Sequence, residues 1–321
     1  MKAAEVRERM NRYGKAKRPF LFAVDFDLSE GIFIGEPLTH NEILFRTPAA
    51  SNAGTLFSPD LLGSVSLFPV AYDEYKRQFE TVMEGLRQGD SFLTNLTVRT
   101  PVFIHNSLRE IFLATHSPYG LFVPGAFVCF SPERFVRIKN GIISTNPMKG
   151  TLNAEIENAE QLLTDDPKET AEHYTIVDLL RNDIGMVAGE VKVERFRYMD
   201  RIKTKSGTIL QTSSEITGRL GVNYLSCLGD LIFRMLPAGS VSGAPKKSTV
   251  AIIQRAERIS RGFYCGVFGY FDGKELDSAV MIRFIEEQNG EKYFRSGGGI
   301  TVNSNPESEY REVLDKIKLP V

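Results

Sequence analysis

The chain has 321 residues, of which 42% are hydrophobic and 25% are charged, and both values are ordinary for a globular protein. Its formal net charge of −1 argues against an electrostatic surface for nucleic acid or for an anionic membrane. No apolar run approaches the roughly 20 residues that span a bilayer, so neither a membrane nor a nucleic acid is an expected partner.

The N-terminal residues 1–17 are polar and charged, and they lack the apolar core of a secretory signal. Three cysteines, Cys129, Cys227 and Cys265, are widely spaced and odd in number, which argues against a disulfide framework and against a zinc site. Cys129 and Cys265 lie in apolar runs and are expected to be buried thiols. The expected compartment is a reducing cytoplasm.

Strand-like runs dominate two regions of the chain. The first region contains the runs 20–24, 32–34, 92–104, 121–130 and 135–144. The second region contains the runs 191–202, 208–220, 264–271, 278–286 and 292–295. These runs are rich in aromatic and β-branched residues, as strands are.

Helical periodicity separates the strand runs. Residues 73–88 place apolar side chains on one helical face, and Gly89 supplies a C-terminal stop. Asp166 followed by Pro167 is a favourable helix start. Further helices are expected over 223–235, 244–258 and 306–318. The pattern indicates an α+β or α/β layered domain, and because no long linker divides the chain, a single domain over 1–321 is expected.

Lys149 is a candidate nucleophile. It lies in the run Asn-Pro-Met-Lys-Gly-Thr, from Asn146 to Thr151, after an apolar stretch. By itself it could be a solvated lysine in a turn, as most lysines are surface groups. A nucleophilic role would require the neutral amine, so burial or a nearby positive charge would have to lower its pKa.

Two glutamate pairs form a candidate metal site. Glu169 and Glu172 lie in the first turns of one predicted helix, and Glu309 and Glu312 lie in the last. The spacing of three residues places both carboxylates of a pair on one helical face. Oxygen ligands of this kind suit Mg²⁺, although such pairs more often face solvent.

Glycine-rich backbone and a single arginine are candidates for binding an anion. Residues 237–246 lead into a helix, and Gly297, Gly298 and Gly299 follow a strand. Exposed backbone N–H groups suit a carboxylate, although tight turns would explain the glycines equally well. Arg283 is the one cation in an apolar strand-like run and needs an anionic partner, either a ligand carboxylate or a structural ion pair.

Taken together, these stretches resemble the chorismate-utilising enzymes, the family that includes anthranilate, aminodeoxychorismate, isochorismate and salicylate synthases. The resemblance covers about residues 73–318. The matching stretches are 89–96, 131–135, 147–151, 171–183, 237–246, 264–270 and 297–312. The resemblance implies a layered α+β sandwich of two large antiparallel β-sheets flanked by helices.

The resemblance also implies roles for site residues. Mg²⁺ would bridge the glutamate pairs and the substrate, with Glu172 and Glu312 as direct ligands and Glu169 and Glu309 holding water. Arg283, Tyr264 and the backbone of 297–299 would hold the enolpyruvyl carboxylate of chorismate. Glu133 would be the general acid that protonates the departing C4 hydroxyl, a role that needs a raised pKa.

Four positions distinguish reactions within the family. Lys149 stands where enzymes similar to aminodeoxychorismate synthase have lysine, and it would attack C2 of chorismate before ammonia adds at C4. Leu93 replaces the lysine base of isochorismate-forming members, and Gln211 replaces the histidine of members that eliminate pyruvate. Ser240 stands where anthranilate synthases more often have threonine. Gln211 and Ser240 are therefore expected at the substrate.

The resemblance therefore implies an aminodeoxychorismate synthase large component of 4-aminobenzoate and folate biosynthesis. Because the chain has no Cys-His-Glu constellation for glutamine hydrolysis, a glutamine amidotransferase subunit is the expected partner. The alternatives are anthranilate synthase component I and a non-catalytic chorismate-binding subunit. The N-terminal segment, about 1–70, is shorter than in typical members, so no tryptophan site is expected.

Overall fold

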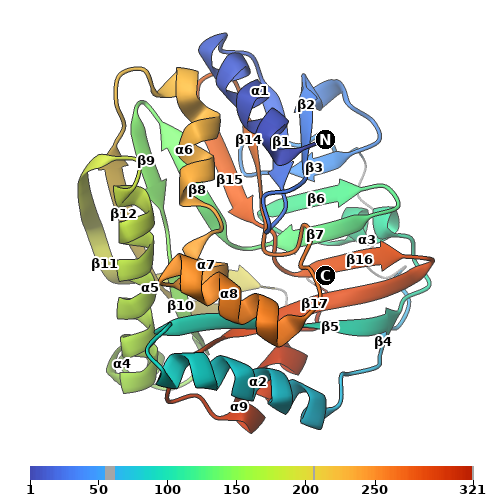
Figure 1. Ribbon diagram of the computed structural model, residues 1–321, viewed down its shortest axis with the longest axis vertical. Coiled ribbons are helices and arrows are strands. Elements are labelled where there is room, and N and C mark those ends of the chain that lie inside the picture. Colours follow the sequence, from blue (N-terminus) through green and yellow to red (C-terminus); the bar gives the residue numbers. More distant parts are fainter. Residues whose placement is uncertain (55–61, 205–206, 320–321) are drawn as a thin grey trace.

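The computed structural model describes residues 1–54, 62–204 and 207–319 (Figure 1). Two antiparallel sheets form its framework. Along the first sheet the strands are β10 (Met148–Asn153), β12 (Gly207–Arg219), β9 (Ile142–Thr145), β8 (Arg134–Lys139), β15 (Leu276–Val280), β14 (Val267–Phe271), β1 (Phe20–Val24) and β2 (Gly31–Gly35), with β11 (Gly189–Thr204) also paired to β12.

Along the second sheet the strands are β13 (Gly243–Ala244), β5 (Leu93–Phe103), β17 (Glu291–Ile300), β16 (Phe284–Gln288), β7 (Phe127–Ser131), β6 (Tyr119–Val123) and β3 (Leu44–Arg46), with β4 (Ser66–Leu67) on β5. The helices are α1 (Ala3–Lys15), α2 (Tyr72–Arg87), α3 (Leu108–Ala114), α4 (Ala159–Asp165), α5 (Pro167–Gly185), α6 (Leu228–Met235), α7 (Gly239–Ser242), α8 (Lys246–Glu257) and α9 (Pro306–Asp315). Short 3₁₀ turns occupy Pro37–Thr39 and Tyr224–Cys227.

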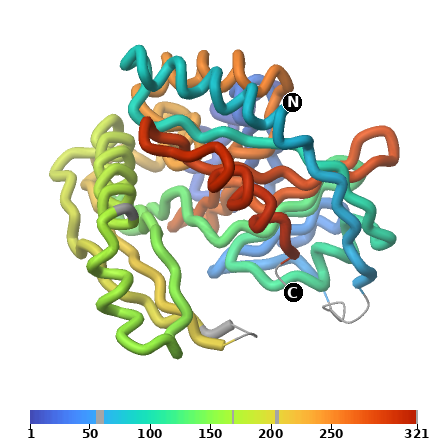
Figure 2. Tube along the Cα trace, turned by 90° about the horizontal axis from the view of Figure 1, so that it is seen from below, coloured from blue at the N-terminus to red at the C-terminus, as the bar shows by residue number. Residues whose placement is uncertain are grey.

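Helices cover the outer faces of both sheets. α1 packs on β1, β2 and α6, while α5 lies along β10, β11 and β12. α2 and α8 lie side by side against β5, and Figure 2 shows this pair along one edge of the molecule. The main core joins both sheets, because Phe22 and Phe268 of the first sheet belong to the same buried cluster as Cys129 and Phe284 of the second. This arrangement confirms the predicted fold class.

Most predicted elements are present. The predicted helix start is confirmed, because Asp166 Oδ1 accepts a hydrogen bond of 3.0 Å from the backbone N–H of Glu169. Gly89 ends α2 with a φ of +79°, a conformation that favours glycine. Cys129 and Cys265 are buried, as predicted. The expectation of a single domain stays a prediction.

Three predicted strands are each two strands. The runs 121–130 and 135–144 turn at Gly125 and at Asn140-Gly141, where φ is positive, so each forms a hairpin. The run 278–286 divides into β15 and β16 at Arg283, whose φ is +55°. Strand propensity continued across these positions, and only a turn in the backbone separates the elements.

Other boundaries also differ from the predictions. Tyr264 and Cys265 precede β14 instead of starting it, and the predicted helix over 223–235 begins with a 3₁₀ turn. The sequence reading missed α1, α3 and α4, which are short or mostly polar helices held by tertiary packing.

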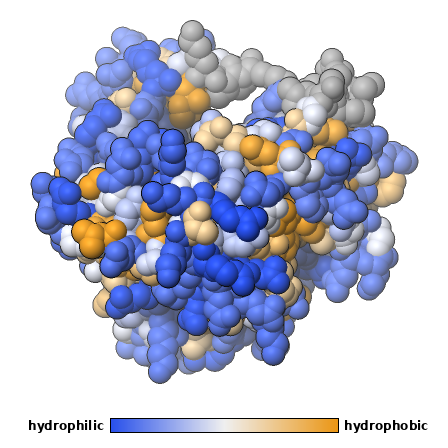
Figure 3. All heavy atoms as spheres, turned by 90° about the horizontal axis from the view of Figure 1, so that it is seen from above, coloured by the Kyte–Doolittle hydropathy of each residue, from blue (hydrophilic) through white to orange (hydrophobic). Residues whose placement is uncertain are grey.

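None of the helices in the described ranges is both long and apolar enough to span a bilayer. Figure 3 shows a mainly hydrophilic face on which apolar side chains gather in small, separate groups. This surface agrees with the ordinary charged fraction of the chain.

Candidate active site

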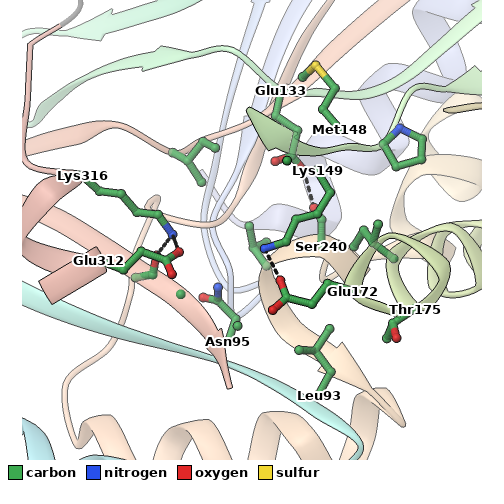
Figure 4. Close-up of a pocket in the computed structure, with 18 of the residues that line it drawn as sticks. Leu93, Asn95, Glu133, Met148, Lys149, Glu172, Thr175, Ser240, Glu312 and Lys316 are labelled. Atoms are coloured by element: carbon green, nitrogen blue, oxygen red, sulfur yellow. Dashed lines mark hydrogen bonds and ion pairs between the residues drawn. The ribbon is translucent and has the colours of Figure 1, made fainter. Parts of the chain in front are cut away.

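A cavity of about 870 Å³ lies where β5, β10 and β17 meet α5 and α9 (Figure 4). Most of the predicted site residues line it. These are Glu133, Lys149, Glu172, Gln211, Ser240, Tyr264, Arg283, Gly297, Gly298, Gly299 and Glu312. Residues from nine separate segments therefore converge on one space, while Glu169 and Glu309 lie outside its lining.

Lys149 extends into the cavity from β10, so the expectation of a turn is wrong. The pairing of β10 with β12 shifts register between Met148 and Thr151, and Gly150 has a φ of +81°. Because such a φ favours glycine, the local bulge depends on Gly150. Bulges re-aim neighbouring side chains, and this one presents Lys149 to α5.

The amine of Lys149 is held as an ammonium group. Its Nζ lies 2.5 Å from Oε2 of Glu172. Burial by itself would lower the pKa of Lys149, but the carboxylate of Glu172, with those of Glu169 and Glu312, outweighs burial and raises the pKa. The lowered pKa that a nucleophilic role requires is therefore absent from this arrangement, because three carboxylates act on the amine.

Glu133 and Ser240 form the second polar pair of the cavity. The Ser240 hydroxyl donates a hydrogen bond of 2.5 Å to Oε1 of Glu133, and the backbone N–H of Glu133 donates to Ser131 Oγ at 3.1 Å. Removal from water raises the pKa of Glu133, and Ser240 and Lys316 oppose this only in part. The carboxyl therefore keeps its proton to a higher pH than an exposed glutamate does.

The two helices bring their carboxylates to the cavity from opposite sides. On α5, Glu172 lines the cavity, while a methyl group on Gly150 would lie 3.2 Å from Oε2 of Glu169. On α9, Glu309 is buried and Glu312 lines the cavity. A methyl group on Gly298 would lie 3.6 Å from Glu309 and 3.8 Å from Glu312, so both carboxylates gather over this glycine.

Lysines hold the two carboxylates that face the cavity. Glu172 is paired with Lys149, and Glu312 Oε1 lies 2.7 Å from Nζ of Lys316. Within the described part of the chain, no three carboxylate, imidazole or thiol groups are close enough together to hold a metal ion. The glutamates of the two helices thus share the region with ammonium groups in this structure.

Arg283 lies between strands and not within one, which corrects the sequence reading. Its Nη1 donates to the carbonyl of Lys316 at 2.7 Å, and burial lowers its pKa. Among the described residues Arg283 has no ion-pair partner. The guanidinium of Arg283 lines the cavity and donates to a backbone carbonyl instead of to a carboxylate. It is therefore suited to binding an anion.

Tyr264 and the three glycines also line the cavity. Tyr264 is buried against Phe284, and burial raises its pKa far above the usual range, so its hydroxyl stays neutral. The residues Gly297–Gly299 belong to β17 instead of following a strand. They pair with Thr97, Leu96 and Asn95 of β5, and at Gly297 a methyl group would lie 2.6 Å from the carbonyl oxygen of Leu96, so this close approach requires a glycine.

Gln211 and Leu93 line the cavity. Gln211 lies on β12, where its Nε2 donates to Thr151 Oγ1 at 3.4 Å. Leu93 starts β5 and contributes an apolar side chain. Neither side chain titrates near neutral pH, so neither provides a base at its position.

Sequence reasoning missed Lys316 and Asn95, which both line the cavity. Lys316 Nζ also donates to the carbonyl of Gly297 at 2.8 Å, which ties α9 to β17. Its position four residues after Glu312 was a usable signal, because that spacing places both on one helical face. Asn95 gave no signal beyond being a polar residue in a strand.

Comparisons with known proteins agree with this site. The family model described as chorismate binding enzyme matches residues 67–321. An "Uncharacterized PabA-like protein" of Haemophilus influenzae is 47% identical over 315 residues, which are 98% of this chain and 96% of that protein. The aminodeoxychorismate synthase component 1 of Salmonella typhimurium is 36% identical over 261 residues, 76% of this chain.

The chain matches 56% of the length of that Salmonella protein. Among solved structures, anthranilate synthase component I of Streptococcus pneumoniae superposes with a TM-score of 0.66 and 30% identity, over 82% of this chain and 60% of that chain. The family model covers the segments that build the cavity. The chain belongs to the chorismate binding enzyme family.

Proposed function

We propose that this protein is an aminodeoxychorismate synthase, which converts chorismate and ammonia to 4-amino-4-deoxychorismate on the route to 4-aminobenzoate and folate. One observation carries the proposal: the amine of Lys149 and the carboxyl of Glu133 line the same cavity. The first is a nucleophile once it is neutral, and the second has a raised pKa that suits a general acid. Arg283 and Tyr264 at the same cavity suit a carboxylate of the substrate.

The proposed reaction has two displacement steps that conserve atoms and charge. The neutral amine of Lys149 forms a bond to C2, the ring double bond shifts, and the C4 hydroxyl leaves as water with the proton of Glu133. Ammonia then forms a bond to C4, the double bond shifts back, and Lys149 leaves C2 as a neutral amine. The product carries its nitrogen as an ammonium group, and Glu133 regains a proton from solvent.

The carboxylates of Glu169, Glu172, Glu309 and Glu312 fit a hard divalent cation, and we propose Mg²⁺. Their oxygens are the donors that Mg²⁺ prefers, and three of them act on the charge of Lys149 at once. When bound, Mg²⁺ would supply positive charge to orient a substrate carboxylate. Glu172 and Glu312 would hold it directly, since these two line the cavity.

Binding of Mn²⁺, followed by electron paramagnetic resonance, tests the metal site without turnover. The native chain should bind one Mn²⁺ that Mg²⁺ displaces, and Glu312→Gln should weaken this binding. A matched control is Glu307→Gln, in the first turn of α9 but outside the cavity lining. Equal Mn²⁺ affinity in the native chain and Glu312→Gln would contradict the proposed ligand.

The proposed partner is a glutamine amidotransferase subunit that supplies ammonia. Burial raises the pKa of Cys129 to about 12 and that of Cys265 to about 11, and burial also raises the pKa of Cys227. Cysteine nucleophiles require a lowered pKa, so these thiols are unsuited to hydrolysing glutamine. The name aminodeoxychorismate synthase component 1, given to the Salmonella relative, also suggests a second component.

The second candidate function is that of anthranilate synthase component I, the activity named for the Streptococcus pneumoniae structure. Lys149 and Gln211 in the cavity favour amination at C4 without loss of pyruvate. A chorismate-binding subunit without activity is the third candidate, and the nucleophile, the acid and the carboxylates at one cavity argue against it.

Mass spectrometry of the products from chorismate, Mg²⁺ and ammonium at mildly alkaline pH tests the proposal. The native chain should form aminodeoxychorismate, and Lys149→Ala should not. Lys139→Ala is the matched control, because Lys139 pairs with Glu275 on the surface. Anthranilate from the native chain would overturn the proposed product, and tight chorismate binding without turnover, even with an amidotransferase present, would favour the binding subunit.

A further inference from the structure

Asn95 has a buried polar atom that the described protein residues do not satisfy. Its side chain lies on β5 in the cavity lining, and Oδ1 is inaccessible with no hydrogen-bond partner in the described part of the chain. Buried polar atoms nearly always have a partner, and an exception calls for an explanation. In the view of Figure 4 the amide lies between Glu312 and Glu172.

The backbone around Asn95 is firmly held, so the amide has a defined position. Arg261 Nη2 donates to the carbonyl of Asn95 at 2.7 Å. Arg261 is itself paired with Glu257 at 2.6 Å, and Glu257 accepts from the backbone N–H of Thr97 at 2.8 Å. This buried ion pair holds the backbone of β5 at Asn95 and at Thr97.

The opposite strand leaves the amide uncovered. Asn95 pairs with Gly299 of β17, which has no side chain to cover the amide. Because alternate strand residues share a face, Leu93 and Asn95 both face the cavity, and both line it. The acceptor Oδ1 of Asn95 therefore lies on the same face of β5 as the apolar side chain of Leu93.

The chemistry of the acceptor limits what binds it. An amide carbonyl accepts hydrogen bonds, so the carboxylates of chorismate, Glu172 and Glu312 cannot satisfy it when ionised. The ammonium groups of Lys149 and Lys316 are donors at the cavity that already pair with Glu172 and Glu312. The donors that the proposed reaction adds are the N–H groups of ammonia and the O–H group of the substrate. As ammonia attacks C4, its nitrogen becomes positive and its N–H groups become stronger donors.

We propose that Asn95 binds the attacking nitrogen, by accepting an N–H hydrogen bond from ammonia as its bond to C4 forms and the bond from Lys149 to C2 breaks. This role rests on the proposed function. An acceptor aimed at a charge that develops during the reaction lowers the barrier more than it strengthens ground-state binding.

Steady-state kinetics of the full chain with chorismate and ammonium test this role. Asn95→Leu, of similar size but without an acceptor, should lower kcat/KM for ammonium about tenfold or more. KM for chorismate should stay within about twofold, since the ring contacts remain. Asn95→Ser is the second variant, and it should show the same selective loss if Asn95→Leu does not fold.

Thr175→Val is the matched control. Thr175 also lines the cavity, but its hydroxyl already donates to the carbonyl of Ala171 at 2.9 Å, so kcat/KM for ammonium should change little. A rise in KM for chorismate with unchanged kcat/KM for ammonium would show that Asn95 binds the substrate hydroxyl, and no change in either would show no binding role. Each of these two results overturns the inference about Asn95 and leaves the proposed function standing. A native chain that forms no aminated product overturns the proposed function and this inference together.

Discussion

The ammonium group of Lys149 lies 2.5 Å from the carboxylate of Glu172, so the proposed nucleophile and a proposed metal ligand hold each other. The contact joins β10 to α5 at the edge of the cavity. It keeps the amine charged, because Glu172 outweighs the burial of the lysine. The amine becomes a nucleophile only when this arrangement changes, and the binding of substrate at the cavity is the event that we expect to change it.

Replacement of Lys149 by arginine separates its two roles. Arginine keeps the positive charge beside Glu172, but its guanidinium stays protonated and is a poor nucleophile. We expect Lys149→Arg to lose amination by on the order of a thousandfold, with a melting temperature within about 2 °C of native. If Lys149→Arg retains most of the amination rate, then Lys149 contributes only its positive charge and is not the nucleophile.

Glu133 should make stability depend on pH. Its pKa is raised in the folded protein, mainly by burial, so its contribution to stability is present below the unfolded-state pKa and is lost as pH rises through the folded pKa. The free energy of unfolding of the native chain, relative to Glu133→Gln, should therefore fall as the pH rises above about 4, the ordinary pKa of a glutamate. Urea titrations across this range measure the difference, and a rise would contradict the assignment.

Ser240→Ala should shift the pH dependence of activity. The Ser240 hydroxyl donates to the Glu133 carboxylate and lowers its pKa, so its loss raises that pKa further. If Glu133 is the general acid, the loss of kcat/KM at alkaline pH should begin at a higher pH in Ser240→Ala than in the native chain. An unchanged pH profile would show that Glu133 does not cause the loss of kcat/KM at alkaline pH.

Gly150→Ala should disturb the bulge that presents Lys149. Gly150 has a φ of +81°, which costs an alanine about 1–2 kcal/mol. The added methyl group would also lie 3.2 Å from Oε2 of Glu169, so activity should fall together with stability. Gly125→Ala is the control, because Gly125 also has a positive φ but open space around it, and there stability should fall without loss of activity per folded molecule.

Arg261→Met should destabilise the fold. The side chains of Arg261 and Glu257 are 1% and 4% exposed, so removal of the arginine leaves a buried carboxylate unpaired, at a cost of about 3–5 kcal/mol. The double variant Arg261→Met, Glu257→Leu should recover part of this loss, because no unpaired charge remains. Chemical denaturation of the three proteins gives the comparison, and additive losses would argue against the ion pair as the cause.

Local patterns identified many elements, because helix periodicity and capping act within a few residues. The start of α5 at Asp166-Pro167 and the end of α2 at Gly89 were predictable for this reason. The division of 278–286 at Arg283 was not, because its positive φ arises where the chain passes between two sheets. The bulge at Lys149 and Gly150 was not predictable either, because it depends on the pairing of β10 with β12.

The sequence by itself determined which chemical groups this protein can use: Lys149, Glu133, Arg283 and the two glutamate pairs were all visible as residue types at informative spacings. Only the tertiary structure decided how they meet, because strands and helices far apart in the chain build one cavity. It paired Lys149 with Glu172 and Lys316 with Glu312, and so reversed the expected pKa shift of the amine. Charge interactions depend on distance and burial, which spacing along the chain does not specify.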